Sequence, residues 1–429
     1  MRRRVLDLAT WLDPVTRVQP PADFDSIQGT RPPDDLGGPF LGLTPEQAVL
    51  RACALADVGE SETVLARAAA EVTDWAAVRE SALRHGLIAL LHRRLRSAPP
   101  HTVPAPVLDE LRALAVANER RSLFMGGQLL GLIGLLARTG IEALPYKGPV
   151  MAEGLYGDAG LRQSVDLDLL VRPRDVETTR DTLVAEGFRQ ASCVGVGIER
   201  LLASECEVAF DSPDRTFTVD LHWRLGPRFA HASLAADDLF AQTCPSTFLG
   251  HDLRVLSRVD LFVVLCVHGS HSHRWDELEL VAALGAWGAD ATIEEWHALF
   301  DRAAALGCLR RCLIGCRLMR DLTGCPVPAT IGALLERDGL AVALARVARL
   351  RLCEDGVPAR AVDGLRGIVW ESLALDTAGV MAPHFVARVV TPGTWDWESS
   401  LVSSRLPALY YLSRPVRLAR RYLGRGGTG

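Results

Sequence analysis

The chain has 429 residues, a length typical of two or three domains, and 48% of its residues are hydrophobic while 6% are aromatic. Its net charge of −5 and pI near 6.1 give no overall attraction to nucleic acid, so we expect no DNA partner. No apolar run approaches the ~20 residues that span a bilayer, and the ten cysteines are scattered as reduced thiols usually are. We therefore expect a cytoplasmic protein without a transmembrane segment.

The N-terminal third changes from a loop-like to a helical pattern. Residues 1–40 are rich in Pro, Asp and Gly, which predicts an irregular leader. A capped helix then begins, with Thr44 as the N-cap and Gln47 three residues later. Because Ala- and Leu-rich helical periodicity follows, we predict four or five helices over 41–139.

Strand patterns begin at Gly140. The predicted order is a short buried strand, a helix, a second strand and an amphipathic helix, over residues 141–148, 149–158, 165–173 and 174–188. We expect Val176, Leu183 and Val184 to lie on one face of that last helix. Two further segments alternate around Ser212-Pro213-Asp214 and predict an antiparallel pair, at residues 205–211 and 216–225.

Helical patterns return after Leu256. We therefore predict an α+β protein, in which a small mixed-sheet core at 140–256 is flanked by helical regions at 41–139 and 257–429. Cys308, Cys312 and Cys316 recur every four residues in one of the later helices, and we expect them to pack as small apolar groups.

Two predicted strands carry acidic residues. In VDLDLLV, Asp166 and Asp168 alternate with apolar residues, so both carboxylates lie on one face of the strand. Adjacent carboxylates repel unless a cation neutralises them, and the pattern therefore indicates Mg²⁺. Asp220 lies between apolar neighbours in TFTVDLHW. Three carboxylates from two strands could hold two metal ions for an in-line attack on phosphorus.

Lys147 is the one lysine among 47 lysine and arginine residues. A chain that uses arginine elsewhere retains lysine here, which indicates a site that needs a compact ammonium. Gly148 follows a predicted strand and precedes a helix, where backbone amides can bind phosphate oxygens. We therefore expect Lys147 and Gly148 to bind nucleotide phosphates. Arg162 either clamps a phosphate or pairs with Asp158.

These segments together resemble a known family. The stretch PYKGPVMAEGLYGDAGLRQSVDLDLLVRPRD, followed by VDLHWRL, resembles the uncharacterised nucleotidyltransferases of bacterial biosynthetic and accessory gene clusters, with similarity from about Leu144 to Trp275. Strand, glycine turn, helix, D-x-D strand and a later strand with one Asp is the layout of a polymerase β-type nucleotidyltransferase core. The chain is also similar to toxin-type nucleotidyltransferases, which share the Lys-Gly turn and the Arg-x-Ser-x-Asp stretch that places Arg162 and Ser164 at the nucleotide.

The resemblance departs at one point, since most superfamily members carry Gly-Ser where this chain has Lys147-Gly148. It implies an enzyme that moves a nucleoside monophosphate from an NTP to an unidentified small-molecule or peptide acceptor and releases pyrophosphate. Asp166, Asp168 and Asp220 would be the catalytic metal ligands, with two Mg²⁺ ions, for which Mn²⁺ could substitute. The alternatives are a toxin-type enzyme acting on tRNA or protein, and a catalytically silent module that binds nucleotide or a partner.

Three further residues are candidates for the acceptor pocket, namely His222, Trp223 and His268. His222 and Trp223 follow Asp220 directly, and packing at the edge of the core is the simpler interpretation for both. His268 begins an H-x-x-H-x-H pattern with His271 and His273 near a predicted helix end. Zinc binding would be the other use of such histidines, but no companion Cys or carboxylate spacing supports it.

Overall fold

The computed structural model describes residues 43–55, 61–226, 234–353, 365–391 and 414, and the predicted leader lies outside these ranges. Residues 43–429 cluster into one compact unit. The divisions near 140 and 257 therefore follow the change of secondary structure along the chain, and they remain a prediction as domain boundaries.

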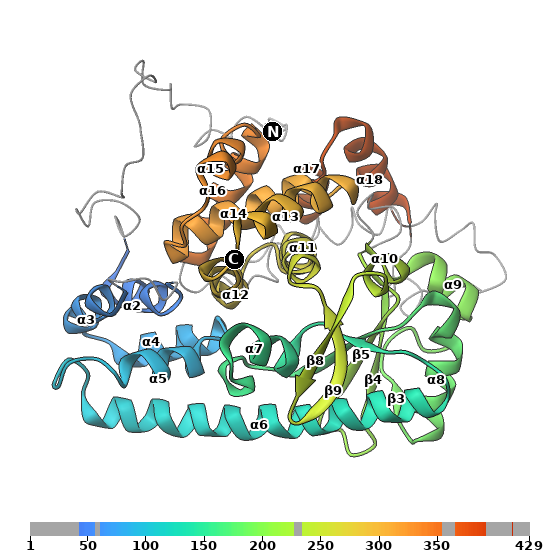
Figure 1. The fold of residues 1–429 in the computed structure, drawn as a ribbon, viewed down its shortest axis with the longest axis horizontal. Helices are drawn as coiled ribbons and strands as arrows, with labels where there is room; N and C mark the ends of the chain where they lie inside the picture. The colour runs from blue at the N-terminus through green and yellow to red at the C-terminus, as the bar shows by residue number, and fades with distance from the viewer. Residues whose placement is uncertain (1–42, 56–60, 227–233, 354–364, 392–413, 415–429) are drawn as a thin grey trace, which may run out of the picture. The chain divides into compact units, whose positions relative to one another are not determined.

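Five helices of the described residues precede the sheet: α2 (Pro45–Cys53), α3 (Ser61–Glu71), α4 (Trp75–Arg84), α5 (Ile88–Leu95) and α6 (Ala105–Arg138). The predicted start of α2 is confirmed, because Thr44 and Gln47 form a capping box. Figure 1 shows α6 running from these helices toward the sheet, where it contacts α7 and β2. α6 thus connects the N-terminal helices with the core.

The central sheet has five strands in the order β1-β2-β5-β4-β3. Their bounds are β1 (Leu144–Pro145), β2 (Asp166–Leu170), β3 (Arg189–Gln190), β4 (Glu207–Asp211) and β5 (Thr218–His222). β2 and β5 are parallel, whereas the other neighbouring pairs are antiparallel. The predicted α+β class with a small mixed sheet is therefore confirmed.

Short helices connect these strands: α7 (Gly148–Tyr156), η1 (Ala159–Leu161), η2 (Pro173–Asp175), α8 (Val176–Ala185) and α9 (Ile198–Ser204). Val176 and Leu183 of α8 are fully buried in the hydrophobic cluster that also contains the apolar residues of β2, β4 and β5, as expected. The expectation for Val184 is wrong, because its exposed fraction is 51%. Val184 is adjacent to Leu183, and the 100° rotation per residue carries it past the edge of the buried stripe.

Two hairpins follow that the sequence patterns did not predict. They are β6 (Arg224–Leu225) with β7 (Leu234–Ala235), and, after α10 (Ala236–Phe240), β8 (Thr243–Phe248) with β9 (His251–Leu256). The turn of the second hairpin places Leu249 and Gly250 at positive φ. A Leu-Gly turn lacks the Asn or Asp that usually announces such a hairpin.

The C-terminal part is helical. Its elements are α11 (Arg258–His268), the π-helical turn η3 (Gly269–His273), α12 (Leu278–Ala289), α13 (Ile293–Ala305), α14 (Leu309–Thr323), α15 (Ala329–Leu335), α16 (Gly339–Cys353), α17 (Leu365–Leu373) and α18 (Ala378–Val390). Cys308, Cys312 and Cys316 are buried in its core, so the packing prediction is confirmed. No helix in the described ranges is long and apolar enough to cross a bilayer.

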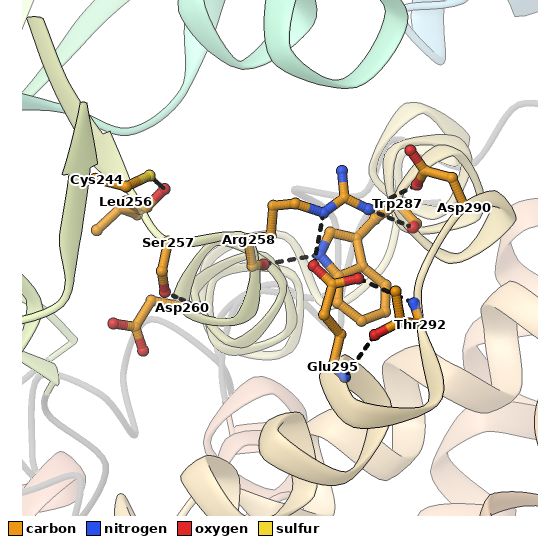
Figure 2. Close-up of polar contacts among 9 residues, drawn as sticks. All are labelled: Cys244, Leu256, Ser257, Arg258, Asp260, Trp287, Asp290, Thr292 and Glu295. Atoms are coloured by element: carbon orange, nitrogen blue, oxygen red, sulfur yellow. Dashed lines mark hydrogen bonds and ion pairs between the residues drawn. The ribbon is translucent and has the colours of Figure 1, made fainter. Parts of the chain in front are cut away.

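Arg258, at the start of α11, ties α11 to α12 and α13 (Figure 2). Its Nη2 is 2.6 Å from Asp290 Oδ1 and its Nε is 3.0 Å from Glu295 Oε1. In return, the Trp287 indole donates to the Arg258 carbonyl at 2.7 Å. These contacts fix the direction in which α11 leaves the β8–β9 hairpin, and the end of α11 carries His268 to the sheet.

Candidate functional site

The three predicted carboxylates lie on the two parallel strands at the centre of the sheet. Asp168 of β2 is paired in register with Asp220 of β5, and Asp166 lies two residues before Asp168. Since side chains alternate along a strand, all three carboxylates lie on one face. Leu167 and Leu169 occupy the opposite face and are buried in the core. The predicted neighbouring strands and shared face are therefore present.

The charges of these carboxylates interact strongly. Burial and the charges of Asp168 and Asp166 raise the pKa of Asp220 to about 7. Burial and Asp168 likewise raise the pKa of Asp166. Asp168 behaves in the opposite way: although burial opposes it, the Lys147 ammonium and then His222 hold the pKa of Asp168 well below its usual range. Asp168 is thus ionised, whereas an added cation would stabilise the ionised forms of Asp166 and Asp220.

Lys147 lies beside Asp168 in this cluster of carboxylates. It is the N-cap residue of α7, and its side chain has an exposed fraction of 8%. Its Nζ is 2.8 Å from Asp168 Oδ1 and 3.4 Å from His268 Nε2. The sequence did not predict either contact. The predicted contact of Lys147 with phosphate remains a prediction.

The turn after Lys147 contains a position that requires glycine. Gly148 has φ +68°, a conformation that L side chains rarely adopt. A Cβ built at Gly148 would lie 3.8 Å from Ser164 Oγ. Ser164 is buried, and its hydroxyl has no hydrogen-bond partner among the described residues. A buried hydroxyl without a partner, next to a bare backbone turn, fits a site whose ligand supplies the missing acceptor.

Arg162 does not pair with Asp158, so that alternative is wrong. Its Nε lies 2.7 Å from Glu279 Oε1 in α12, and both side chains are almost fully buried. Asp158 instead accepts from the backbone N–H of Gly160 and caps η1. Burial favours strong, specific pairing for a guanidinium, and here the partner comes from a helix more than one hundred residues away. Residue spacing could not have revealed it.

His222 belongs to the polar network, which makes it more than a packing residue. Its Nε2 is 3.2 Å from Asp168 Oδ1 and its Nδ1 is 3.1 Å from Glu207 Oε2. Although burial opposes it, Glu207 and then Asp168 raise the pKa of His222. Glu207 was not among the predicted site residues. The predicted antiparallel pairing of the two strands could have indicated it, since the register of β4 with β5 places Glu207 opposite His222.

Trp223 packs in the core under the sheet with an exposed fraction of 0%. This burial agrees with packing, the simpler of the two interpretations for this residue. A place for Trp223 at the acceptor pocket remains a prediction.

His271 lies apart from the other two histidines of the H-x-x-H-x-H pattern. His268 lies beside Lys147 and its ring is 4.7 Å from that of His273. His271 instead lies 3.6 Å from Glu371 of α17. His273, Asp276 and Glu277 are the one group in the described ranges whose potential metal-ligand atoms lie within 4.8 Å of one another. Although burial opposes it, hydrogen bonds that His273 donates to these two carboxylates raise its pKa to about 9.

The three aspartates form a fitting ligand set for Mg²⁺, because Mg²⁺ takes carboxylate oxygens. In the described structure, their oxygens do not all lie within 4.8 Å of one another, and Lys147 and His222 hold Oδ1 of Asp168. Burial and mutual repulsion raise the pKa values of Asp166 and Asp220, and a cation would oppose both effects. The donor chemistry therefore suits a divalent cation, whose binding here remains a proposal.

Comparison with known proteins identifies a family for this chain. A family model described as an uncharacterised nucleotidyltransferase matches residues 71–324, a range that holds the elements from α4 to α14, the whole sheet among them. No curated protein and no solved structure matches the chain. Because the family model covers more than half of the sequence, the chain belongs to this family of uncharacterised nucleotidyltransferases.

Proposed function

We propose that this protein is a metal-dependent enzyme that transfers a nucleoside monophosphate from an NTP to an acceptor hydroxyl, phosphate or amine. The observation that carries the proposal is the register of Asp168 with Asp220, which with Asp166 puts three carboxylates on one sheet face. The acceptor is a small molecule or a peptide, and the reaction could belong to a biosynthetic gene cluster. The family to which the chain belongs supports the reaction class.

Asp166, Asp168 and Asp220 would hold two Mg²⁺ ions, with Mn²⁺ as a substitute. When bound, the metals would neutralise the phosphates and polarise the reacting phosphorus. Catalysis of this kind consists mainly of positioning and charge neutralisation. A sheet serves this purpose well, because the hydrogen bonds between β2 and β5 fix the positions of the ligands.

The strand-to-helix turn would bind the phosphates that leave. An ammonium has three N–H donors, and Lys147 directs one to Asp168 and has His268 beside it. The remaining donor can reach a phosphate oxygen. The amide of Gly148 at the start of α7 and the hydroxyl of Ser164 supply two further donors. Arg162 would contribute positive charge from its pair with Glu279.

The chemical step requires the acceptor to lose a proton. The acceptor oxygen or nitrogen attacks the α-phosphorus, and the bond from this phosphorus to the pyrophosphate oxygen breaks. Pyrophosphate leaves with the electron pair of that bond. Asp220 would help to activate the acceptor, either as a metal ligand or as the base that takes its proton. His222 and His268 flank the carboxylates and would line the acceptor side.

The test is release of pyrophosphate from each NTP with Mg²⁺ and fractionated acceptor mixtures. Small metabolites, peptides, total tRNA and denatured protein form separate arms, with Asp168→Asn as the inactive control. Release that requires Mg²⁺, an acceptor and Asp168 supports the proposal. If only the tRNA or protein arm supports release, the toxin-type alternative is correct. Nucleotide binding without release in any arm would establish a silent binding module.

A further inference from the structure

Arg311, in the first turn of α14, is buried without a hydrogen-bond partner. Its exposed fraction is 1%. Its Nε, Nη1 and Nη2 atoms all lack a hydrogen-bond partner among the described residues. A guanidinium carries five N–H donors and remains charged in proteins. Burial is the cause that lowers the pKa of Arg311, because a charged guanidinium loses its hydration in the core.

The acidic groups nearest to Arg311 are engaged elsewhere. The Asp376 carboxylate accepts from the backbone N–H groups of Leu309 and Arg310, at 3.0 and 2.8 Å, and so caps α14. Glu371 of α17 pairs with Arg388 of α18, with Nε 3.0 Å from Oε2. Both carboxylates act on Arg311 only through longer-range attraction. One positive charge in this part of the core therefore has no anion in contact with it.

His271 lies in η3, with its Nδ1 3.6 Å from Oε2 of Glu371. Its Nδ1 is buried without a hydrogen bond among the described residues, and the charge of Arg311 acts on its ring. Burial and then Arg388 and Arg311 hold the pKa of His271 well below its usual value, so the ring is neutral and has one N–H to donate. α14 and η3 are in contact. Arg311 and His271 thus lie on two packed elements, and both carry buried nitrogens without a hydrogen bond among the described residues.

A buried cation without hydrogen bonds costs several kcal/mol, which folded proteins avoid by pairing it. We propose that Arg311, with His271, forms an internal binding site for a small oxyanion, a phosphate or a carboxylate, held between α14, η3 and α17. An oxyanion supplies two or more acceptor oxygens and one negative charge, which is what a guanidinium fork binds best.

This site is separate from the nucleotide site, but one short element links them. η3 carries His271, and its last residue, His273, packs against His268, which lies beside Lys147. π-Helical turns occur often at functional positions. An anion at Arg311 would therefore fix the turn that holds the histidines at the proposed acceptor side.

The first experiment asks what the purified protein contains. Wild type, Arg311→Met and Arg320→Met are purified without phosphate or carboxylate buffers and then denatured in acid. Released phosphate is measured colorimetrically, and carboxylates by ion chromatography. Arg320 is the matched control, because it lies on the same helix but is paired with Asp321 and Glu336. We expect about one equivalent of one anion per chain in wild type and Arg320→Met, and its loss in Arg311→Met.

The second experiment measures thermal unfolding in chloride, with phosphate or succinate added at constant ionic strength. Protein exchanged into chloride should gain ~2 °C or more in midpoint with the anion that fits, because a ligand of the native state raises its stability. Arg311→Met should lose that gain and should unfold higher than wild type in chloride alone. If phosphate raises the unfolding midpoint by binding at Lys147, that increase should persist in Arg311→Met. The variant therefore distinguishes binding at Lys147 from binding at Arg311.

Two results would overturn the proposal. One is the absence of a bound anion together with no midpoint shift in wild type from either anion. The other is an anion content and response that Arg311→Met retains in full. If in addition Arg311→Met unfolds at a lower temperature than wild type in chloride, buried water satisfies the guanidinium instead.

Discussion

The ammonium of Lys147 lies 2.8 Å from Oδ1 of Asp168, so the one lysine of the chain is paired with the central carboxylate of the sheet. The Lys147 ammonium lowers the pKa of Asp168, whereas burial and the neighbouring carboxylates raise those of Asp166 and Asp220. The three carboxylates therefore differ in how well their charges are neutralised.

Removing the charge of Asp168 and of Asp220 should have opposite effects on stability. Asp168→Asn leaves Lys147 buried without its anion and should lower the free energy of unfolding by ~3 kcal/mol. Asp220→Asn removes a carboxylate with a raised pKa and should stabilise the protein by ~1 kcal/mol. Urea denaturation at pH 8 in EDTA measures both. If both substitutions change the free energy of unfolding in the same direction, the pairing of Lys147 with Asp168 as assigned here is contradicted.

Both variants should lose metal-dependent nucleotide binding. Each removes one of the three carboxylates that would hold the ions, while Asn keeps the size of the side chain. Calorimetric titration with Mg²⁺ and a non-hydrolysable NTP checks this, with Val184→Ala as a folded control on an exposed helix position. Unchanged Mg²⁺–NTP affinity in Asp168→Asn would disprove the metal site.

Replacement of Lys147 by arginine should reduce turnover at least about tenfold, or ~1.4 kcal/mol of transition-state stabilisation. The guanidinium is larger and planar, and Lys147 is buried between Asp168 and His268. Turnover at saturating NTP is the measurement once an acceptor is known, and NTP-induced thermal stabilisation is the measurement before that. Equal activity in both proteins would mean that charge alone is required, and would return the phosphate site to Arg162.

Asp220 should make stability and metal binding depend on pH. Its pKa rises from 3.8 to about 7 on folding, so the folded state binds the proton more tightly. Its stabilising contribution is complete below about pH 4 and is lost as pH rises through 7. Divalent cations compete with this proton, and Mn²⁺ affinity should therefore increase between pH 6 and 8. Calorimetric titration of wild type with Mn²⁺ at both pH values checks the affinity, and equal affinities would contradict the expectation. Urea denaturation of wild type and Asp220→Asn at both pH values checks the stability, because the variant lacks the titrating group.

Gly148 and Gly157 provide a matched pair for the phosphate turn. Their φ values are +68° and +69°, and a Cβ at Gly157 would have nothing within 4 Å. Alanine at either position should cost ~1 kcal/mol of stability because of the left-handed backbone. Only Gly148→Ala should weaken NTP binding, since Gly148 lies beside Ser164. If both variants bind NTP as tightly as wild type does, Gly148 is required for the turn alone.

The sequence by itself determined the local parts of this protein. Alternation in VDLDLLV defines β2 and puts Asp166 and Asp168 on one face, because the period of a strand is a local property. The capping box at Thr44 and the helix that begins at Gly148 likewise depend on a few neighbouring residues. The scarcity of lysine singled out Lys147 without any structure.

Tertiary structure alone decided which side chains meet. Glu279 pairs with Arg162, and His268 approaches Lys147, across separations of more than one hundred residues. Such contacts depend on how helices pack against the sheet, and packing sums many weak interactions that no short pattern records. Arg311 shows the same limit, because an arginine in a helix reads as a surface residue until its burial is known. Local order follows from neighbouring residues, whereas the charges that a site balances depend on the whole fold.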